Sequence, residues 1–148
     1  MSKEHPSVFI SYSWDSEKHE DWVTVLATKL RENGVAATID KFETQSRTVN
    51  LNRMMVEKIK NSDNILLILT ENYANKADTF QGGVGYETNL LIQYIKDNLD
   101  KIILIMRHKG DYRKAVPFYL EGFHFIDFSH DDQFDIKFDE LMHRMYQR

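Results

Sequence analysis

The sequence has 148 residues, of which 42% are hydrophobic and 12% aromatic, with a formal net charge of −4 and a pI near 5.8. This composition excludes a disordered chain, and no stretch concentrates the Lys and Arg that a nucleic-acid surface requires. Cysteine is absent, which excludes disulfides and thiolate chemistry, and the six His show no metal-ligand spacing. No apolar run approaches the ~20 residues that span a bilayer. We therefore expect one cytoplasmic domain, residues 1–148, without metal, nucleic-acid or membrane partners.

A buried strand is predicted near the amino terminus, at Val8, Phe9 and Ile10. These residues are apolar without alternation, the pattern of a strand covered on both faces. The polar residues from Ser11 to Asp15 follow, and we expect them at the carboxyl end of this strand, where open α/β sheets bind ligands. The alternative is a core strand that leaves the sheet through hydroxyl-bearing residues without a binding role.

The next segment predicts a helix followed by a second strand. Ser16 is a suitable N-cap, and Asn33–Gly34 supplies the residue that ends such a helix. Apolar residues between them recur at the spacing of one buried helix face: Trp22, Val23, Leu26, Ala27 and Leu30. Residues 35–40 are predicted as the second strand, and a polar loop continues to about Asn50.

The remainder alternates between helical and strand patterns. Helices are predicted around Leu51–Ile59, from Val84 to Asp100 and over Phe134–Met145. Strands are predicted at 65–69, 102–106 and 123–128. A long polar connection is expected over 70–85. Residues 107–122 show no clear period. Five strands alternating with helices indicate an α/β, flavodoxin-like three-layer fold with a parallel sheet in the order 2-1-3-4-5 and helices on both faces.

Several chemistries lack their motifs. Gly82–Gly83–Val84–Gly85 is neither a P-loop nor a dinucleotide fingerprint. A response-regulator receiver needs an Asp at the end of strand three, where this chain has Thr70–Glu71, and the G-x-S-x-G elbow of an esterase is absent.

Glu87 is the most informative titratable residue. It is expected in the first turn of a helix, at the border of the buried face, where burial raises the pKa of a carboxyl and the helix dipole lowers it. The plain alternative is a carboxylate that only satisfies the backbone donors of that helix end.

Taken as a set, the sequence motifs resemble the Toll/interleukin-1 receptor (TIR) superfamily, and within it the SEFIR branch in bacterial form. The resemblance rests on the first strand and its polar exit at 8–15, on Asp40 after strand two, on residues 65–73, and on Gly-Gly-Val-Gly-Tyr-Glu at 82–87. It covers nearly the whole chain. It implies a domain that either assembles with copies of itself for signalling or cleaves NAD+ as a substrate, with no further cofactor.

The resemblance also implies site residues. In the NAD-cleaving relatives the catalytic residue is a Glu early in the helix after strand three, which Glu87 matches. Residues matching the family's nucleotide pocket are Ser11, Tyr12 and Ser13 after strand one, Asp40, Phe42 and Glu43 after strand two, and Tyr86, which can supply a ring surface. The chain departs from many enzymatic relatives at Gly83 and Val84, where they carry Trp and Cys.

Two functions follow from the resemblance. In the first, the chain is an NAD+ nucleosidase that hydrolyses or cyclises NAD+ when a fused or associated sensor domain clusters it in bacterial antiviral defence. We then expect a piece of a longer multidomain protein whose 41–50 loop mediates self-association. In the second, the domain is a non-enzymatic adaptor that binds its own kind, as eukaryotic SEFIR domains do.

Overall fold

The computed structural model describes residues 5–13, 15–41, 57–75, 93–117 and 120–146; within these ranges the side chains of Asp40 and Lys41 are not described. The strands are β1 (Ser7–Tyr12), β2 (Ala36–Lys41), β3 (Asn64–Leu69), β4 (Ile102–Met106) and β5 (Phe125–Asp127). The helices are α1 (Glu17–Glu32) and α5 (Phe134–Tyr146), with 3-10 turns η1 (Tyr112–Ala115) and η3 (Asp131–Gln133). Helical residues also occupy 57–61, 71–75 and 93–97.

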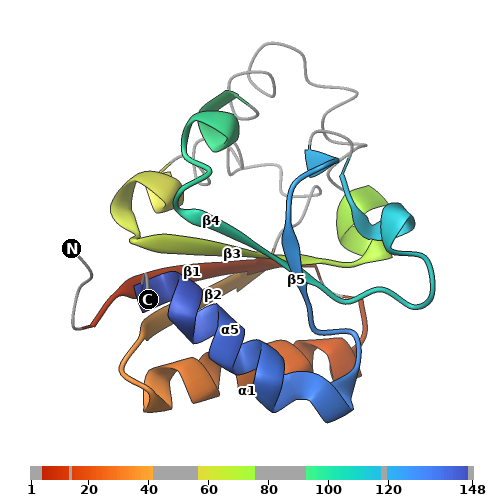
Figure 1. The fold of residues 1–148 in the computed structure, drawn as a ribbon, viewed down its shortest axis with the longest axis horizontal. Helices are drawn as coiled ribbons and strands as arrows, with labels where there is room; N and C mark the ends of the chain where they lie inside the picture. The colour runs from red at the N-terminus through yellow and green to blue at the C-terminus, as the bar shows by residue number, and fades with distance from the viewer. Residues whose placement is uncertain (1–4, 14, 42–56, 76–92, 118–119, 147–148) are drawn as a thin grey trace.

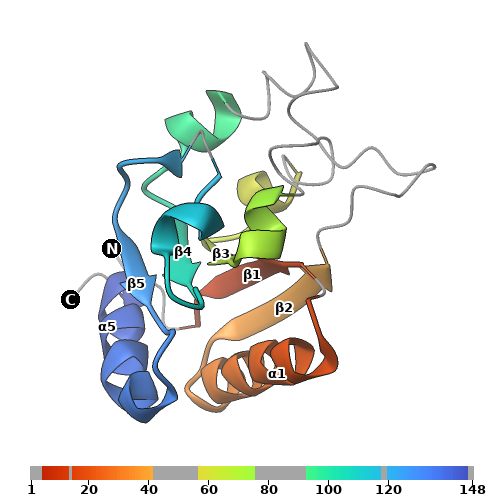
Figure 2. The same cartoon turned by 90° about the vertical axis from the view of Figure 1, so that its right-hand side faces the viewer.

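All pairings in the five-stranded sheet are parallel, and the strand order is β2-β1-β3-β4-β5. The predicted flavodoxin-like order is therefore confirmed. α1 and α5 cover one face of the sheet, and the helical segments 57–61 and 93–97 cover the other (Figures 1 and 2). From β1 the sheet extends to β2 on one side and to β3, β4 and β5 on the other, so the strand order reverses between β1 and β3. Ligands of such sheets bind at this switch point, beyond the carboxyl ends of the strands.

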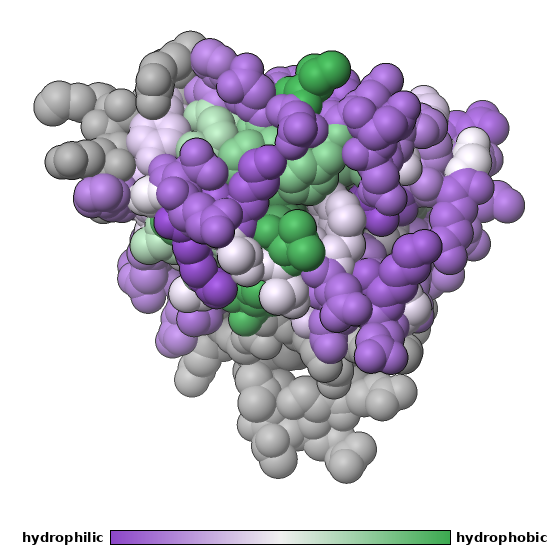
Figure 3. All heavy atoms as spheres, turned by 90° about the horizontal axis from the view of Figure 1, so that it is seen from below, coloured by the Kyte–Doolittle hydropathy of each residue, from purple (hydrophilic) through white to green (hydrophobic). Residues whose placement is uncertain are grey.

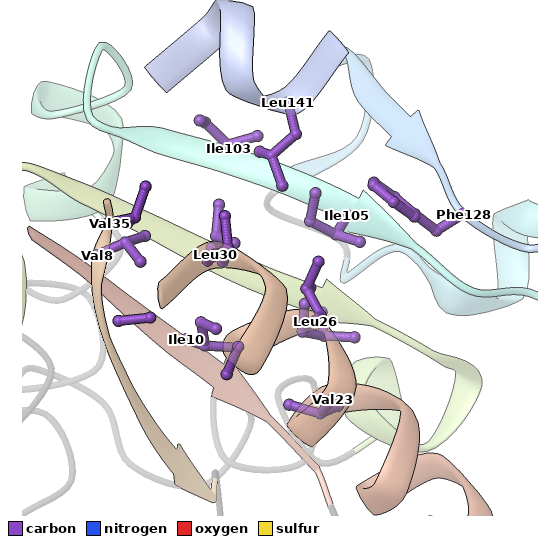
Figure 4. Close-up of a cluster of buried hydrophobic side chains, with 14 of the residues drawn as sticks. Val8, Ile10, Val23, Leu26, Leu30, Val35, Ile103, Ile105, Phe128 and Leu141 are labelled. Atoms are coloured by element: carbon purple, nitrogen blue, oxygen red, sulfur yellow. The ribbon is translucent and has the colours of Figure 1, made fainter. Parts of the chain in front are cut away.

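Alternate residues of each central strand pack into different core clusters, because side chains of a strand point to opposite faces. On the α1 and α5 face, Ile10 and Ile105 pack with Leu26, Leu30 and other residues of one cluster (Figure 4). On the opposite face, Leu67 and Leu104 belong to a second cluster. β3 and β4 are buried at every position, as their unbroken aliphatic sequence predicts.

The predicted boundaries of α1 are confirmed at both ends. The hydroxyl of Ser16 accepts a hydrogen bond from the amide of His19, 3.1 Å away, which satisfies one of the free donors of the first turn. At the other end Gly34 has φ of +90°, and the amide of Val35 donates to the carbonyl of Leu30 at 3.0 Å. This is the Schellman arrangement, in which a glycine accepts the left-handed conformation without a steric cost.

Four boundaries differ from the sequence-based expectation. β1 continues through Tyr12, because its pairing with β2 extends to Tyr12 opposite Lys41. Residues 71–75 are helical inside the expected polar connection, where the Thr70 hydroxyl accepts from the amide of Tyr73 at 3.1 Å and so caps the turn. The helix expected to reach Asp100 ends at residue 97, and β5 covers only three of the six residues expected.

The face formed by α1 and α5 is mainly hydrophilic around a small apolar area (Figure 3). Val25 and Ile136 are its exposed large apolar side chains, at 56% and 70% exposure. Within the described ranges, no helix has both the length and the apolar character required to cross a bilayer.

Candidate functional site

A cleft of about 750 Å³ opens at the carboxyl edge of the sheet. Its walls come from the segment between β1 and α1, from the exit of β3 with helix 71–75, from the segment after β4 with η1, and from Ser129 after β5. We call it the edge cleft. Its volume lies within the range of small-molecule sites, and its position matches the ligand-binding edge of open α/β sheets.

Hydrogen bonds tie the exit of β1 to the exit of β3. The hydroxyl of Ser13 donates to Asp15 and lies 3.3 Å from the hydroxyl of Thr70. The amide of Asn72 donates to the same Asp15 oxygen at 3.1 Å. Ser13 is fully buried, so these contacts fix the position of the Asp15 carboxylate at the wall of the edge cleft.

The predicted residues Ser11, Tyr12 and Ser13 all turn their side chains into the protein. Ser11 is buried, with its hydroxyl 3.0 Å from that of Tyr73. Tyr12 is 4% exposed and donates a hydrogen bond of 3.0 Å to Glu20. None of the three lines the edge cleft as the structure describes it. Their role in nucleotide binding stays a prediction.

The side chains of the other predicted site residues are not described by the structure. Asp40 lies at the carboxyl end of β2, where it pairs with Ser11 of β1, but its side chain is not described. Phe42, Glu43, Tyr86 and Glu87 lie outside the described residues, as do most of the 41–50 loop and residues 82–87. Their assignment therefore rests on the sequence.

His19 is a buried titratable group in the wall of the edge cleft. It is 8% exposed, and in the described structure its Nε2 atom has no hydrogen-bond partner. Its ring is stacked with that of Trp22, with 6.4 Å between the ring centroids and an angle of 8° between the ring planes. Burial lowers the pKa of His19; the Asp15 carboxylate raises it, but Arg107 and Lys109 lower it further. The ring is accordingly neutral at pH 7.

Arg107 connects the cleft to the end of β5. Its guanidinium lies 4.3 Å from the centre of the Trp22 ring, a cation–π contact. The same group donates hydrogen bonds of 2.8 Å to the Phe128 carbonyl and to Asp131. Arg107 is thus held in place by neighbours on both sides, and its position at the cleft does not depend on a ligand.

His108 and Asp127 form an ion pair beside Arg107, with 3.6 Å between Nε2 and the carboxylate when the imidazole is protonated. Partial burial raises the pKa of Asp127, but hydrogen bonds from Ser129 and the nearby His108 and His130 outweigh burial, so the pKa of Asp127 is lowered. The Nδ1 atom of His108 accepts from the amide of Gly110. Because Nε2 faces Asp127 and Nδ1 is occupied, this His is not placed as a base for a hydroxyl nucleophile.

The residues after β4 were missed by the sequence analysis. Residues 107–122 show no period and therefore carried no prediction, although Arg107, His108 and Lys109 come directly after a buried parallel strand. The rule applied to the exit of β1, that strand ends at this edge bear ligand-binding residues, applies equally to them.

Comparisons with known proteins agree with this architecture. The sequence pattern of the TIR domain family matches residues 8–142. A solved prokaryotic SEFIR domain is 30% identical, with a TM-score of 0.73 over 97% of this chain and 94% of that one. The TIR domains of the activated Roq1 resistosome, which directly recognizes the pathogen effector XopQ, are 15% identical, with a TM-score of 0.49 over 96% and 84% of the two chains. No curated protein matches. With a family pattern that spans nearly its full length and a SEFIR relative over the same extent, the chain belongs to the TIR domain family.

Proposed function

We propose that this TIR domain is an NAD+ glycohydrolase that cleaves the bond between nicotinamide and ribose. The observation that carries the proposal is the TIR pattern over residues 8–142, a family with NAD-cleaving members, together with a Glu at position 87 where those members have their catalytic carboxylate. Glu87 follows β3 in the sequence, and β3 lies next to β1 at the switch point of the strand order. The carboxyl edge at this point is the expected place for a nucleotide.

The proposed reaction needs one carboxylate. The carbon–nitrogen bond to nicotinamide breaks, and nicotinamide leaves as a neutral molecule with the bonding electron pair. The ribose passes through a state with oxocarbenium character, which the Glu87 carboxylate stabilises by its charge. Water then adds to the ribose carbon and releases a proton, so that the products are ADP-ribose, nicotinamide and H+. In a cyclising variant, a nitrogen of the adenine replaces water as the nucleophile.

Self-association is proposed as the switch for this activity. The 41–50 loop is polar and follows β2 at the same edge of the sheet, from which it can reach a second copy. A fused or associated sensor domain would raise the local concentration of copies, and binding between them then favours the assembled form by mass action. We assign this role to bacterial antiviral defence, by the resemblance to TIR effectors.

The second candidate is an adaptor that only assembles. The solved relative at 30% identity is described as a SEFIR domain, the branch that includes adaptors in eukaryotes. In this alternative Glu87 is a helix-end carboxylate, and its neutralisation costs about 0.3 to 1 kcal/mol of stability and no activity.

Glu87→Gln separates the two candidates, because it keeps the shape of the side chain and removes its charge. If the domain is an enzyme, Glu87→Gln should lower the rate of nicotinamide release by roughly 10² to 10³-fold and leave the melting temperature nearly unchanged. Glu32→Gln is the matched control: it lies at the last position of α1, exposed and at the opposite edge of the sheet. A Glu87→Gln domain that melts normally and releases nicotinamide as fast as wild type would remove the catalytic assignment.

A further inference from the structure

We propose that His108 is a pH switch for the segment of residues 109–111, which contributes to the wall of the edge cleft. The uncharged imidazole of His108 holds this segment in place, and the protonated imidazole releases it. The inference concerns the wall of the cleft and does not depend on Glu87 or on NAD+ cleavage.

The hydrogen bonds of the His108 ring define its protonation state. Its Nδ1 atom accepts a hydrogen bond of 3.1 Å from the amide of Gly110. An atom that accepts from an N–H group must have a free lone pair, so Nδ1 carries no proton and the neutral ring has its hydrogen on Nε2. Nε2 faces the Asp127 carboxylate at 3.6 Å. The structure therefore contains an uncharged His108, and Nδ1 is the ring atom that can still take a proton.

Protonation of the ring removes its bond to Gly110. A proton on Nδ1 converts the acceptor into a donor, so that two N–H groups face each other. Imidazole is the side chain that changes its charge between about pH 5 and 8. The bond from Gly110 to His108 is therefore expected at neutral pH and is lost in mild acid.

The opposite side of the ring holds it more strongly when it is charged. Partial burial raises the pKa of Asp127, but hydrogen bonds from Ser129 and the nearby His108 and His130 outweigh burial and lower it. Asp127 thus stays ionised in mild acid and attracts the imidazolium. The ring of His130 lies 6.5 Å from that of His108, between their centroids, and adds a second group that can become positive.

Other charged groups near His108 have their own partners or make no contact with its ring. Arg107 is bonded to Asp131 at 2.8 Å, and Asp111 is bonded to Arg113 at 3.1 Å. The remaining charged or titratable residues that line the cleft beside His108 are Asp15, Lys18, His19, Glu71, Lys109 and Lys114. Within the described ranges, no hydrogen bond or ion pair joins any of them to the His108 ring. The carboxylate of β5 is accordingly the direct partner of the imidazolium.

The backbone of His108 is fixed, whereas the segment that follows it is not. The His108 amide donates a hydrogen bond of 2.8 Å to the Ser129 hydroxyl. In the part of the chain that the structure describes, Lys109 and Gly110 make no hydrogen bond besides the one to Nδ1. Gly110 is exposed, with φ of +138°, and a Cβ at this position would meet no heavy atom within 4 Å beyond its chain neighbours. Loss of the Nδ1 bond therefore releases the segment and leaves the ring in place.

The released segment ends at η1, which has contacts of its own. Asp111 caps η1 by accepting from the Arg113 amide at 3.1 Å, and the ring of Tyr112 lies 5.5 Å from that of Phe125. These contacts do not involve the switch, so they limit the change to the residues before η1. Lys109 lines the cleft and is the charged side chain that gains freedom. The position of one cation at the cleft wall thus depends on pH.

The test is an NMR titration of the whole 15N-labelled chain from about pH 7.5 to 5. At neutral pH we expect the signal of an unprotonated nitrogen at Nδ1 of His108 and a Gly110 amide that is protected from hydrogen exchange. As the pH falls, the chemical shift and protection of this amide should change with the midpoint of the His108 ring, and the heteronuclear NOE of Lys109 and Gly110 should decrease. A proton on Nδ1 at neutral pH, or a ring that titrates without a response of the Gly110 amide, would overturn the inference.

His108→Asn separates this bond from the general effects of acid. An Asn side-chain oxygen accepts from the amide two residues further on and does not titrate, so the Gly110 signals should become independent of pH. His143→Asn is the matched control, because His143 also faces an aspartate, Asp139 at 3.4 Å, but on α5. It should keep the wild-type transition.

His130→Asn tests the neighbouring histidine and should also keep the transition of Gly110. A transition that persists in His108→Asn, or that disappears in His130→Asn or His143→Asn, would assign the pH response to another group and overturn the inference. If His108→Asn does not fold, the wild-type titration decides the question, because it records the ring and the amide in the same molecule.

Discussion

The hydroxyl of Tyr73 lies 3.0 Å from the hydroxyl of Ser11, and both groups are buried. This hydrogen bond joins the carboxyl-terminal end of β1 to the helical segment 71–75 that follows β3, across the switch point of the strand order. Burial raises the pKa of the Tyr73 phenol to about 12, and the hydrogen bond with Ser11 lowers it by a smaller amount. The pair therefore holds together the two strand exits at which the candidate site lies.

Tyr73→Phe should destabilise the domain by about 1 to 3 kcal/mol, because it leaves the buried Ser11 hydroxyl without this partner. Urea unfolding measures the change. Tyr112→Phe is the control, since Tyr112 is 47% exposed and loses only a solvated hydroxyl. Adding Ser11→Ala to Tyr73→Phe should recover part of the loss, because neither polar group then remains unpaired. Equal stabilities for Tyr73→Phe and Tyr112→Phe would contradict this account.

Stability should fall in alkali because of Tyr73. Its pKa is raised in the folded state, so the folded protein keeps a proton that the unfolded chain releases above about pH 10. The stabilisation is complete below pH 10 and is lost as the pH rises toward 12. Unfolding free energies at several pH values from about 9 to 11 should thus decline more steeply for wild type than for Tyr73→Phe. Parallel curves for the two proteins would refute this effect.

Stability should also fall in mild acid because of His19. Its pKa is lowered from 6.5 in the folded state, so below that value the unfolded chain binds a proton that the folded protein resists. The groups that set its charge environment are Asp15, Arg107 and Lys109, beside the rings of Tyr12 and Trp22. His19→Phe keeps a ring against Trp22 and should flatten the pH dependence between about 6.5 and 5.

The exposed Val25, which has no titratable group, provides the comparison for that experiment. Val25→Ala should leave the acid limb of the stability curve as it is in wild type. A His19→Phe domain with the same acid limb as wild type would show that another group controls this range.

Charge reversal in the 41–50 loop should weaken self-association. Glu43→Lys or Arg47→Glu is expected to lower the sedimentation-measured fraction of assembled domain at a fixed concentration, because contacts between copies become repulsive. Nicotinamide release per molecule should then depend less on concentration. Lys60→Glu, an exposed reversal in the helical segment 57–61, is the control. Unchanged assembly in both loop variants would assign the interface to another surface.

The sheet was predictable from sequence because its strands are marked by unbroken aliphatic runs. Residues 65–69 and 102–106 are too short and too apolar for anything except strands buried on both faces, and the helices between them require parallel pairing. The ends of α1 were predictable because Ser16 and Gly34 act locally, through their own hydroxyl and backbone conformation. Such features need no knowledge of distant residues.

The edge cleft was not predictable in the same way. Lys18 and His19 are neighbours in the chain but lie far from Lys109, and nothing in their local pattern shows that all three line one hollow. Ser11 and Ser13 are candidate site residues because they match the family's pocket, and their role stays a prediction; the structure shows their hydroxyls buried in bonds between strand exits. Polarity at a strand end shows which edge is used, and packing decides which side chains reach the solvent.

Nicotinamide release from NAD+ by the artificially clustered wild-type domain is the most direct test of the proposed function. The domain would be fused to an inducible dimeriser, incubated with NAD+ with and without the inducer, and the products separated by chromatography. We predict that nicotinamide and ADP-ribose, or its cyclic form, appear faster with the inducer, and that Glu87→Gln abolishes their formation while the clustered protein stays folded. Intact NAD+ in the presence of folded, clustered wild-type domain would contradict the enzymatic function and favour the adaptor.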